Sequence, residues 1–182
     1  GQAALSFLKV VESMGREEAA IMEPVACCVH GQARMPIVAS DTVVIIGAGA
    51  IGAIHCELAR LSGARTLILL DILDARLRLI EKLGSAIITI NSADKDASQA
   101  VREALGGAGA DKVIIACPAP SAYPLATKIC RRGGSILFFS GFPPGAEATP
   151  LDINTIHYEE LQILGSFGST RMDQKRSLEL LE

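Results

Sequence analysis

The chain has 182 residues and a formal net charge of −3, with 17 basic side chains interspersed among 20 acidic ones. Because nucleic-acid binding normally needs a clustered excess of Lys and Arg, this balance argues against a nucleic-acid partner. Hydrophobic residues make up 49% of the chain and aromatic residues only 4%, which indicates a folded domain with an aliphatic core rather than a disordered segment.

Neither a membrane span nor a signal peptide is expected. The longest apolar run, residues 42–54, is shorter than the roughly 20 residues that a spanning helix needs, and it is rich in glycine. The five cysteines are an odd set without the spacing of a disulfide framework. We therefore expect reduced thiols and a cytoplasmic location.

From residue 41 onward, short β-rich runs alternate with longer helical ones. The first expected strand, residues 42–46, reads TVVII and ends at Gly47, and a helix with apolar side chains at helical spacing follows over residues 50–61. Further strands are expected over residues 66–70, 86–90, 112–116, 135–140 and 161–164. Further helices are expected over residues 74–83, with Asp74 as the N-cap, and over 96–105 and 121–130.

This alternation predicts an α/β protein with a doubly wound parallel sheet of six strands, the Rossmann fold, in the order 3-2-1-4-5-6. The dinucleotide-binding domain would span residues 41–168. Residues 1–40, with a helix over 17–30, read as a segment left from the junction with a missing catalytic domain. Residues 169–182 read as the start of a C-terminal helix.

The central motif is the glycine-rich sequence Gly47-Ala-Gly49-Ala50-Ile51-Gly52, which follows the first strand and opens the next helix. Gly47 permits the tight turn, Gly49 lets the main chain approach a pyrophosphate, and Gly52 lets the helix pack against the strand. The free N–H groups and partial positive charge of the helix N-terminus favour phosphate binding. The alternative is an ordinary strand-to-helix turn of an α/β protein.

Asp71 ends the second strand and follows Gly52 by 19 residues, close to the ~20 expected for the acidic residue of this motif. Its carboxylate would accept hydrogen bonds from the adenosine ribose and repel a 2′-phosphate, which predicts NAD over NADP. Capping of the next helix is the alternative role. Arg76 can accept a 2′-phosphate, but with Asp71 present we expect it at the adenosine end of NAD.

The segments Glu17-Glu-Ala-Ala-Ile-Met-Glu23-Pro24 and Val43-Val-Ile-Ile-Gly-Ala-Gly-Ala-Ile-Gly52, followed by Asp71 and Arg76, resemble the medium-chain zinc-dependent dehydrogenases. The resemblance covers nearly the whole chain and is greatest to the sorbitol and threonine dehydrogenase branch. It implies that a set of residues on three loops lines the nicotinamide pocket: Ala116, Cys117, Ser140, Gly141, Phe142, Ser166 and Phe167.

The resemblance also implies that Glu23 belongs to a catalytic zinc site, directly or through water; the alternative is an ordinary glutamate in a helix kinked by Pro24. A catalytic zinc needs three protein ligands and an open position. The family's other ligands lie in an N-terminal domain, so zinc is expected only in the intact enzyme. Cys27 is expected near the nicotinamide, whereas His30 and His55 are poor ligand candidates.

The function implied for the intact enzyme is hydride transfer from a secondary alcohol, polyol or hydroxy amino acid to NAD, with this chain alone binding NAD but inactive. A homo-oligomer is expected through the edge of the sixth strand. Two alternatives stay open: a standalone nucleotide-sensing module, and a zinc-free NAD(P)H reductase of the same superfamily. Glu23 disfavours both, and Asp71 disfavours an NADP-dependent reductase.

Overall fold

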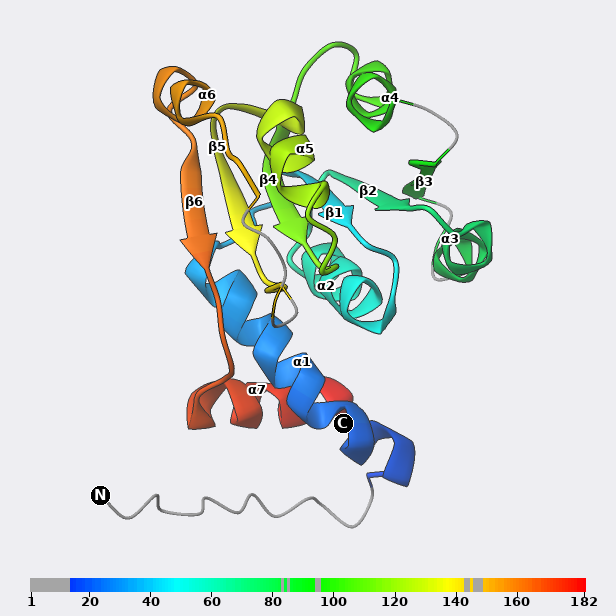
Figure 1. Ribbon diagram of the computed structural model, residues 1–182. Coiled ribbons are helices and arrows are strands. Elements are labelled where there is room, and N and C mark those ends of the chain that lie inside the picture. The colour runs from blue at the N-terminus through cyan, green and yellow to red at the C-terminus, as the bar shows by residue number, and fades with distance from the viewer. Residues whose placement is uncertain (1–13, 83, 85, 94–95, 143–144, 146–148) are drawn as a thin grey trace, which may run out of the picture.

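The computed structural model describes residues 14–82, 84, 86–93, 96–142, 145 and 149–182 (Figure 1). Helices and strands alternate along this part of the chain. The helices are α1 (Arg16–Arg34), α2 (Ala50–Leu61), α3 (Asp74–Glu81), α4 (Ala97–Ala104), α5 (Ala122–Ile129), α6 (Ile153–Tyr158) and α7 (Arg171–Leu181). The strands are β1 (Thr42–Ile46), β2 (Thr66–Asp71), β3 (Ile87–Asn91), β4 (Ala110–Ile115), β5 (Cys130–Phe138) and β6 (Gln162–Gly165).

The six strands form one parallel sheet in the order β3-β2-β1-β4-β5-β6. The predicted fold and strand order are therefore confirmed. The order reverses between β1 and β4, and in open α/β sheets a ligand binds at such a switch point, beyond the carboxyl ends of the strands. β1 is buried along its whole length, as expected for a strand covered on both faces.

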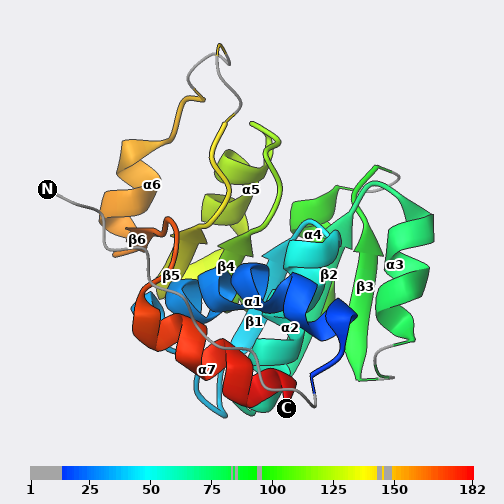
Figure 2. The ribbon, with the colours of Figure 1, turned by 90° about the horizontal axis from the view of Figure 1, so that it is seen from below.

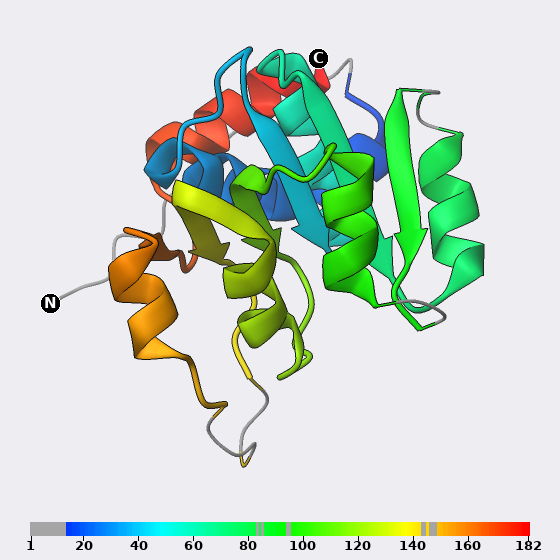
Figure 3. The same cartoon turned by 90° about the horizontal axis from the view of Figure 1, so that it is seen from above.

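Successive side chains of a strand point to opposite faces of the sheet, and this alternation divides the core into two layers. Val44 and Ile46 belong to the layer beneath α4 and α5. Val43 and Ile45 belong to the opposite layer, beneath α2, α3 and the end of α1. The two helical layers flank the sheet in Figures 2 and 3.

α1 lies against the β5 side of the sheet, and α7 packs on the outer side of α1 (Figure 2). Gly31 permits this close approach, because a Cβ there would lie 3.0 Å from Cδ2 of Phe139 and 3.2 Å from Cδ2 of Leu137. The Ser177 hydroxyl donates to the main-chain carbonyl of Met22 at 2.7 Å. None of the described helices combines the length and the apolar character that crossing a membrane requires.

Several expected details were wrong. No helix was expected between the fifth and sixth strands, where α6 lies. Asp74 is the first residue of α3 rather than its N-cap, which is Leu73, and its carboxylate instead accepts a hydrogen bond from Asn91 at 2.6 Å. Most boundaries move by one or two residues, but α1 is four residues longer than expected at its C-terminal end and β5 starts five residues earlier. Leu83, the expected end of the third helix, lies outside the described residues.

Candidate functional site

The glycine-rich turn lies at the switch point, where β1 ends between β2 and β4. Gly47 has φ +108°, a conformation that side chains of L-residues rarely adopt, and its N–H donates to the carbonyl of Leu70 at 2.7 Å. A Cβ on Gly47 would lie 2.9 Å from Cβ of Cys117. The turn therefore needs glycine for its backbone conformation and for its closeness to the end of β4.

Gly49 and Gly52 have different surroundings. Gly49 is the N-cap of α2, and no side chain caps this helix end. No heavy atom lies within 4 Å of a Cβ added to Gly49, so the main chain there is open to a ligand. A Cβ on Gly52 would lie 1.8 Å from the carbonyl oxygen of Gly47, so α2 can begin at this place only with glycine. Ala50 and Ile51 form the first turn of α2, whose free N–H groups suit an anion.

The Asp71 carboxylate is buried, and it is part of the same turn. Its Oδ2 accepts a hydrogen bond from the N–H of Ala48 at 2.8 Å, and its Oδ1 accepts one from the N–H of Leu73 at 3.0 Å. The Arg76 guanidinium approaches Oδ2 at 3.4 Å, and its side chain is 52% exposed. Asp71 thus organises the glycine-rich turn, while Arg76 presents a positive charge to solvent beside it.

The carboxyl ends of β4 and β5 bring two further predicted groups to this edge. Ala116 and Cys117 follow β4 beside Gly47, and the Ala116 N–H donates to the carbonyl of Ile46 at 2.8 Å. Burial raises the pKa of the Cys117 thiol, and the Asp71 carboxylate acts in the same direction, so the thiol is protonated at neutral pH. Ser140 follows β5, and its N–H donates to the carbonyl of Ile115 at 3.0 Å.

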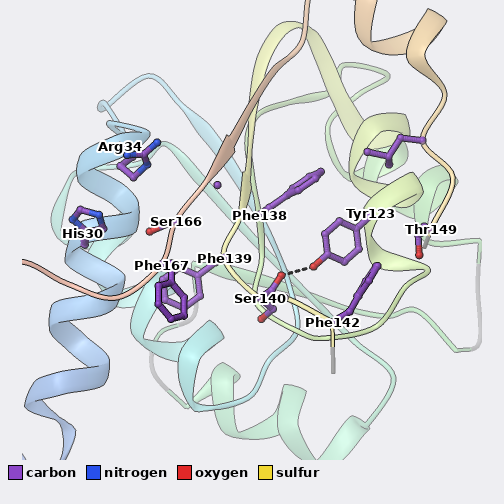
Figure 4. Close-up of a pocket in the computed structure, with 13 residues that line it drawn as sticks. His30, Arg34, Tyr123, Phe138, Phe139, Ser140, Phe142, Thr149, Ser166 and Phe167 are labelled. Atoms are coloured by element: carbon purple, nitrogen blue, oxygen red, sulfur yellow. Dashed lines mark hydrogen bonds between the residues drawn. The ribbon is translucent and has the colours of Figure 1, made fainter. Parts of the chain in front are cut away.

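A hollow of about 710 Å³ extends beyond the carboxyl ends of β5 and β6 (Figure 4). One side is aromatic, because Tyr123 packs edge to face against Phe138 and Phe142 at ring-centroid distances of 4.8 and 4.7 Å. The Tyr123 hydroxyl donates to the carbonyl of Ser140. Gly141, Ser166 and Phe167 complete the predicted residues on this hollow, and α1 contributes His30 and Arg34 on the opposite side (Figure 4).

A second hollow of about 230 Å³ lies against α1 and holds Glu23 and Cys27. It shares Phe139, Ser166 and Phe167 with the larger hollow. The Cys27 thiol donates to Oε1 of Glu23 at 3.1 Å. Burial raises the pKa of Cys27 to about 11, and the Glu23 carboxylate adds to this effect, so the thiol is protonated at neutral pH.

Within the described ranges, no group of three or more His, Cys, Asp or Glu side chains is arranged to hold a metal ion. Glu23, the predicted zinc residue, has one potential ligand beside it, the Cys27 thiol. Because a catalytic zinc needs three protein ligands, the described residues do not fit a complete zinc site.

The aromatic side of the larger hollow was predicted only in part: Phe142 and Phe167 were expected at the nicotinamide pocket, whereas Tyr123, Phe138 and Phe139 were not. The chain has only five Phe and two Tyr, and four of the Phe and one Tyr line this hollow: Tyr123, Phe138, Phe139, Phe142 and Phe167. In a chain so poor in aromatic residues, their concentration near the ends of strands was a usable signal. The pairing of His30 with Asp173, 143 residues apart, gave no such signal.

These features define a dinucleotide-binding Rossmann domain. The family model described as zinc-binding dehydrogenase matches residues 50–182, which is more than half of the chain. The chain therefore belongs to the zinc-binding dehydrogenase family.

The chain is similar to several named dehydrogenases. The chain is 34% identical over 159 residues to erythritol/L-threitol dehydrogenase from Mycolicibacterium smegmatis, with 87% of this chain and 43% of that protein aligned. It is 31% identical over 158 residues to sorbitol dehydrogenase from Bacillus subtilis, with 87% and 44% aligned. The chain thus spans about half the length of the curated relatives it matches.

Solved structures agree on the fold. A zinc-binding dehydrogenase from Sinorhizobium meliloti, solved with NADP bound, superposes with a TM-score of 0.88 at 30% identity and covers 96% of this chain and 51% of that one. An alcohol dehydrogenase from Thermus sp. ATN1 superposes with a TM-score of 0.85 at 23% identity, with 96% and 49% covered. The second likeness concerns the fold alone.

Proposed function

We propose that this chain is the NAD-binding part of a zinc-dependent dehydrogenase that oxidises a small secondary alcohol, polyol or hydroxy amino acid. The observation that carries the proposal is the turn formed by Gly47 to Gly52, which leaves the uncapped N-terminus of α2 open at the switch point. The names of the relatives support the alcohol and polyol classes.

In this proposal, different residues contact different parts of the dinucleotide. The pyrophosphate lies on Gly49, Ala50 and Ile51 at the start of α2. Asp71 and Arg76 contact the adenosine ribose. The nicotinamide extends over the ends of β4 to β6, and the residues that border it are Ala116, Cys117, Ser140, Gly141, Phe142, Ser166 and Phe167. The domain binds and orients the ring so that one face meets the alcohol carbon, while the hydride chemistry belongs to the cofactor.

The preference for NAD over NADP rests on the charges at the end of β2. A 2′-phosphate would approach the buried Asp71 carboxylate, which lies 2.8 Å from the Ala48 N–H, and the repulsion disfavours NADP. The half-exposed Arg76 acts in the opposite sense. Because the Sinorhizobium meliloti relative was solved with NADP, the two cofactors must be compared directly.

Calorimetric titration of the chain with NAD and with NADP tests the assignment. We expect NAD to bind more tightly and Asp71→Ala to lose that preference. A matched variant, Arg76→Ala, should instead weaken NADP more than NAD. If neither nucleotide binds, the proposed function fails for this chain, and if NADP binds more tightly, the specificity argued from Asp71 is wrong.

Zinc binding is proposed only for the whole protein, with Glu23 as the residue contributed by this chain. The carboxylate lies on the second hollow, beside the proposed nicotinamide border. The remaining ligands would come from outside the described residues. In the intact enzyme the zinc ion supplies Lewis-acid chemistry.

We also propose that the whole protein is a cytoplasmic homo-oligomer that acts on a small molecule. The described cysteines are free, as expected in a reducing compartment. β6 ends the sheet and pairs only with β5 among the described strands, so it can pair with the same strand of a second copy.

A further inference from the structure

His30 forms a short contact between two helices that are far apart in the sequence. Its Nδ1 lies 2.9 Å from Oδ2 of Asp173, joining α1 to the first turn of α7. The Asp173 side chain is 12% exposed and that of His30 is 23% exposed, so the contact is largely shielded from water. A hydrogen bond to an ionised group in such a place is stronger than one at the surface.

Asp173 also fixes the start of α7. The same Oδ2 accepts hydrogen bonds from the N–H of Thr170 at 2.7 Å and from its hydroxyl at 2.6 Å. Burial raises the pKa of Asp173, but the hydrogen bonds from Thr170 and His30 outweigh it and hold the pKa below its ordinary value. Asp173 is therefore an ionised acceptor that joins His30 to the N-cap of α7.

We call the contact between His30 and Asp173 the His30–Asp173 joint. The segment between β6 and α7, residues 166–169, lies directly before it in the chain. At its start, the Ser166 N–H donates to the carbonyl of Phe138 at 3.2 Å. Gly168 has φ +69°, Phe167 is fully exposed, and Oγ of Ser166 is buried without a partner among the described residues. The segment borders both hollows. Figure 4 shows Ser166 and Phe167 on the larger one. The segment is thus held at its start by the hydrogen bond between Ser166 and Phe138, and after its end by Asp173, which binds Thr170.

We propose that His30 and Asp173 are positioning residues that hold the 166–169 segment in place for the nicotinamide end of the cofactor. The inference rests on the proposed function, because the segment borders the nicotinamide in that proposal. Asp173 lines neither of the two hollows, and His30, although it lines the larger one, acts in this proposal through its contact with Asp173. Their effect should therefore fall on the nicotinamide half of the dinucleotide and spare the adenosine half.

Two nucleotides separate these halves. NAD contains both, whereas ADP-ribose lacks only the nicotinamide. We expect His30→Ala to weaken NAD binding by about tenfold, as loss of a charge-assisted hydrogen bond would predict, with ADP-ribose affinity unchanged. His30→Asn should restore most of the NAD affinity, because its amide N–H can occupy the place of Nδ1. Ser177→Ala is the matched control, since it removes another hydrogen bond between α1 and α7, away from the His30–Asp173 contact.

A second readout does not depend on nucleotide binding. The chain has no Trp, so Phe167→Trp places a single fluorophore on the segment at a fully exposed position. In this background His30→Ala should lower the fluorescence anisotropy, while His30→Asn and Ser177→Ala should leave it unchanged.

The inference is overturned if His30→Ala leaves the anisotropy unchanged, or if it weakens NAD and ADP-ribose equally, which would indicate a general loss of stability. If the unmodified chain binds neither nucleotide, the proposed function fails, and the anisotropy alone then decides whether His30 positions the segment.

Discussion

At the residue scale, two glycines of the glycine-rich turn have different roles. The fold leaves no room for a side chain at Gly52, whereas the space beside Gly49 is open to a ligand. Helix propensity favours Ala over Gly by about 1 kcal/mol. At Gly52, however, the added Cβ would lie 1.8 Å from a main-chain oxygen, and rotation of a side chain cannot relieve that clash. Overpacking of this kind costs roughly 1–3 kcal/mol or more, so the clash outweighs the propensity.

We therefore expect Gly52→Ala to lower the free energy of unfolding by about 2 kcal/mol, measured by urea denaturation. Gly49→Ala is the matched variant: its Cβ meets nothing within 4 Å, and the cost is about 1 kcal/mol or less, from a poorer N-cap. It should nevertheless weaken NAD binding, because the methyl group occupies the proposed approach of the pyrophosphate. Equal effects of Gly52→Ala and Gly49→Ala on the free energy of unfolding would contradict the different roles assigned to the two glycines.

His55 gives a pH-dependent prediction. It is fully buried, and burial lowers its pKa to about 3. Gln32 donates to Nδ1 at 3.2 Å and to the main-chain carbonyl of His55 at 2.8 Å, so the neutral ring carries its proton on Nε2. The unfolded chain, with an ordinary histidine pKa near 6.5, binds a proton that the folded chain cannot accept.

The stability due to His55 is accordingly complete above pH 6.5 and lost progressively as the pH falls toward 3. We expect a loss of about 2 kcal/mol between pH 6.5 and pH 5, measured by denaturation at each pH. His55→Leu should flatten this dependence, whatever it does to stability at pH 7.

At the scale of the element, the helices differ in how their N-termini are satisfied. Asp96 caps α4 by accepting hydrogen bonds from Ser98 and Gln99, at 2.9 and 3.2 Å. Asp96→Ala should cost about 1 kcal/mol and lower the melting temperature by about 2–4 °C, whereas Asp96→Asn should stay near the wild type. A calorimetric scan checks both, and an unchanged melting temperature for Asp96→Ala would mean that water replaces the cap.

The strands and long helices were predictable because their signals are local. An aliphatic run such as β1 ending in Gly47 already indicates a buried strand and a turn. α6 was missed because six residues hold too little periodicity to distinguish a helix from a loop. The extra C-terminal turn of α1 depends on packing of Gly31 against Phe139, a contact between distant segments.

The candidate site was predictable to a similar degree. The glycine spacing and Asp71 are visible in the sequence because their roles are set by distance along the chain. The sequence does not show that both carboxylate oxygens of Asp71 accept hydrogen bonds from main-chain N–H groups, because those bonds depend on how β2 meets the turn. The His30–Asp173 joint spans 143 residues, and no spacing rule connects its members.

At the scale of the whole molecule, the edge of β6 that no other described strand pairs with predicts self-association. Sedimentation velocity over a range of micromolar concentrations should show a dimer. Gly165→Lys should shift it toward the monomer, because Gly165 is exposed, nothing lies within 4 Å of an added Cβ, and charge on an edge strand opposes pairing. A strict monomer at every concentration would contradict the proposed oligomer.

The bond from the Ala48 N–H to the Asp71 carboxylate also bears on the order of folding. It joins residues 23 positions apart, with the whole of α2 between them. The turn cannot take its final shape from its own residues, because one of its N–H groups is satisfied only after β1 and β2 have paired. A newly made chain therefore completes this turn through a long-range event, and a chain with α2 formed but β2 undocked should bind a dinucleotide more weakly than the folded domain.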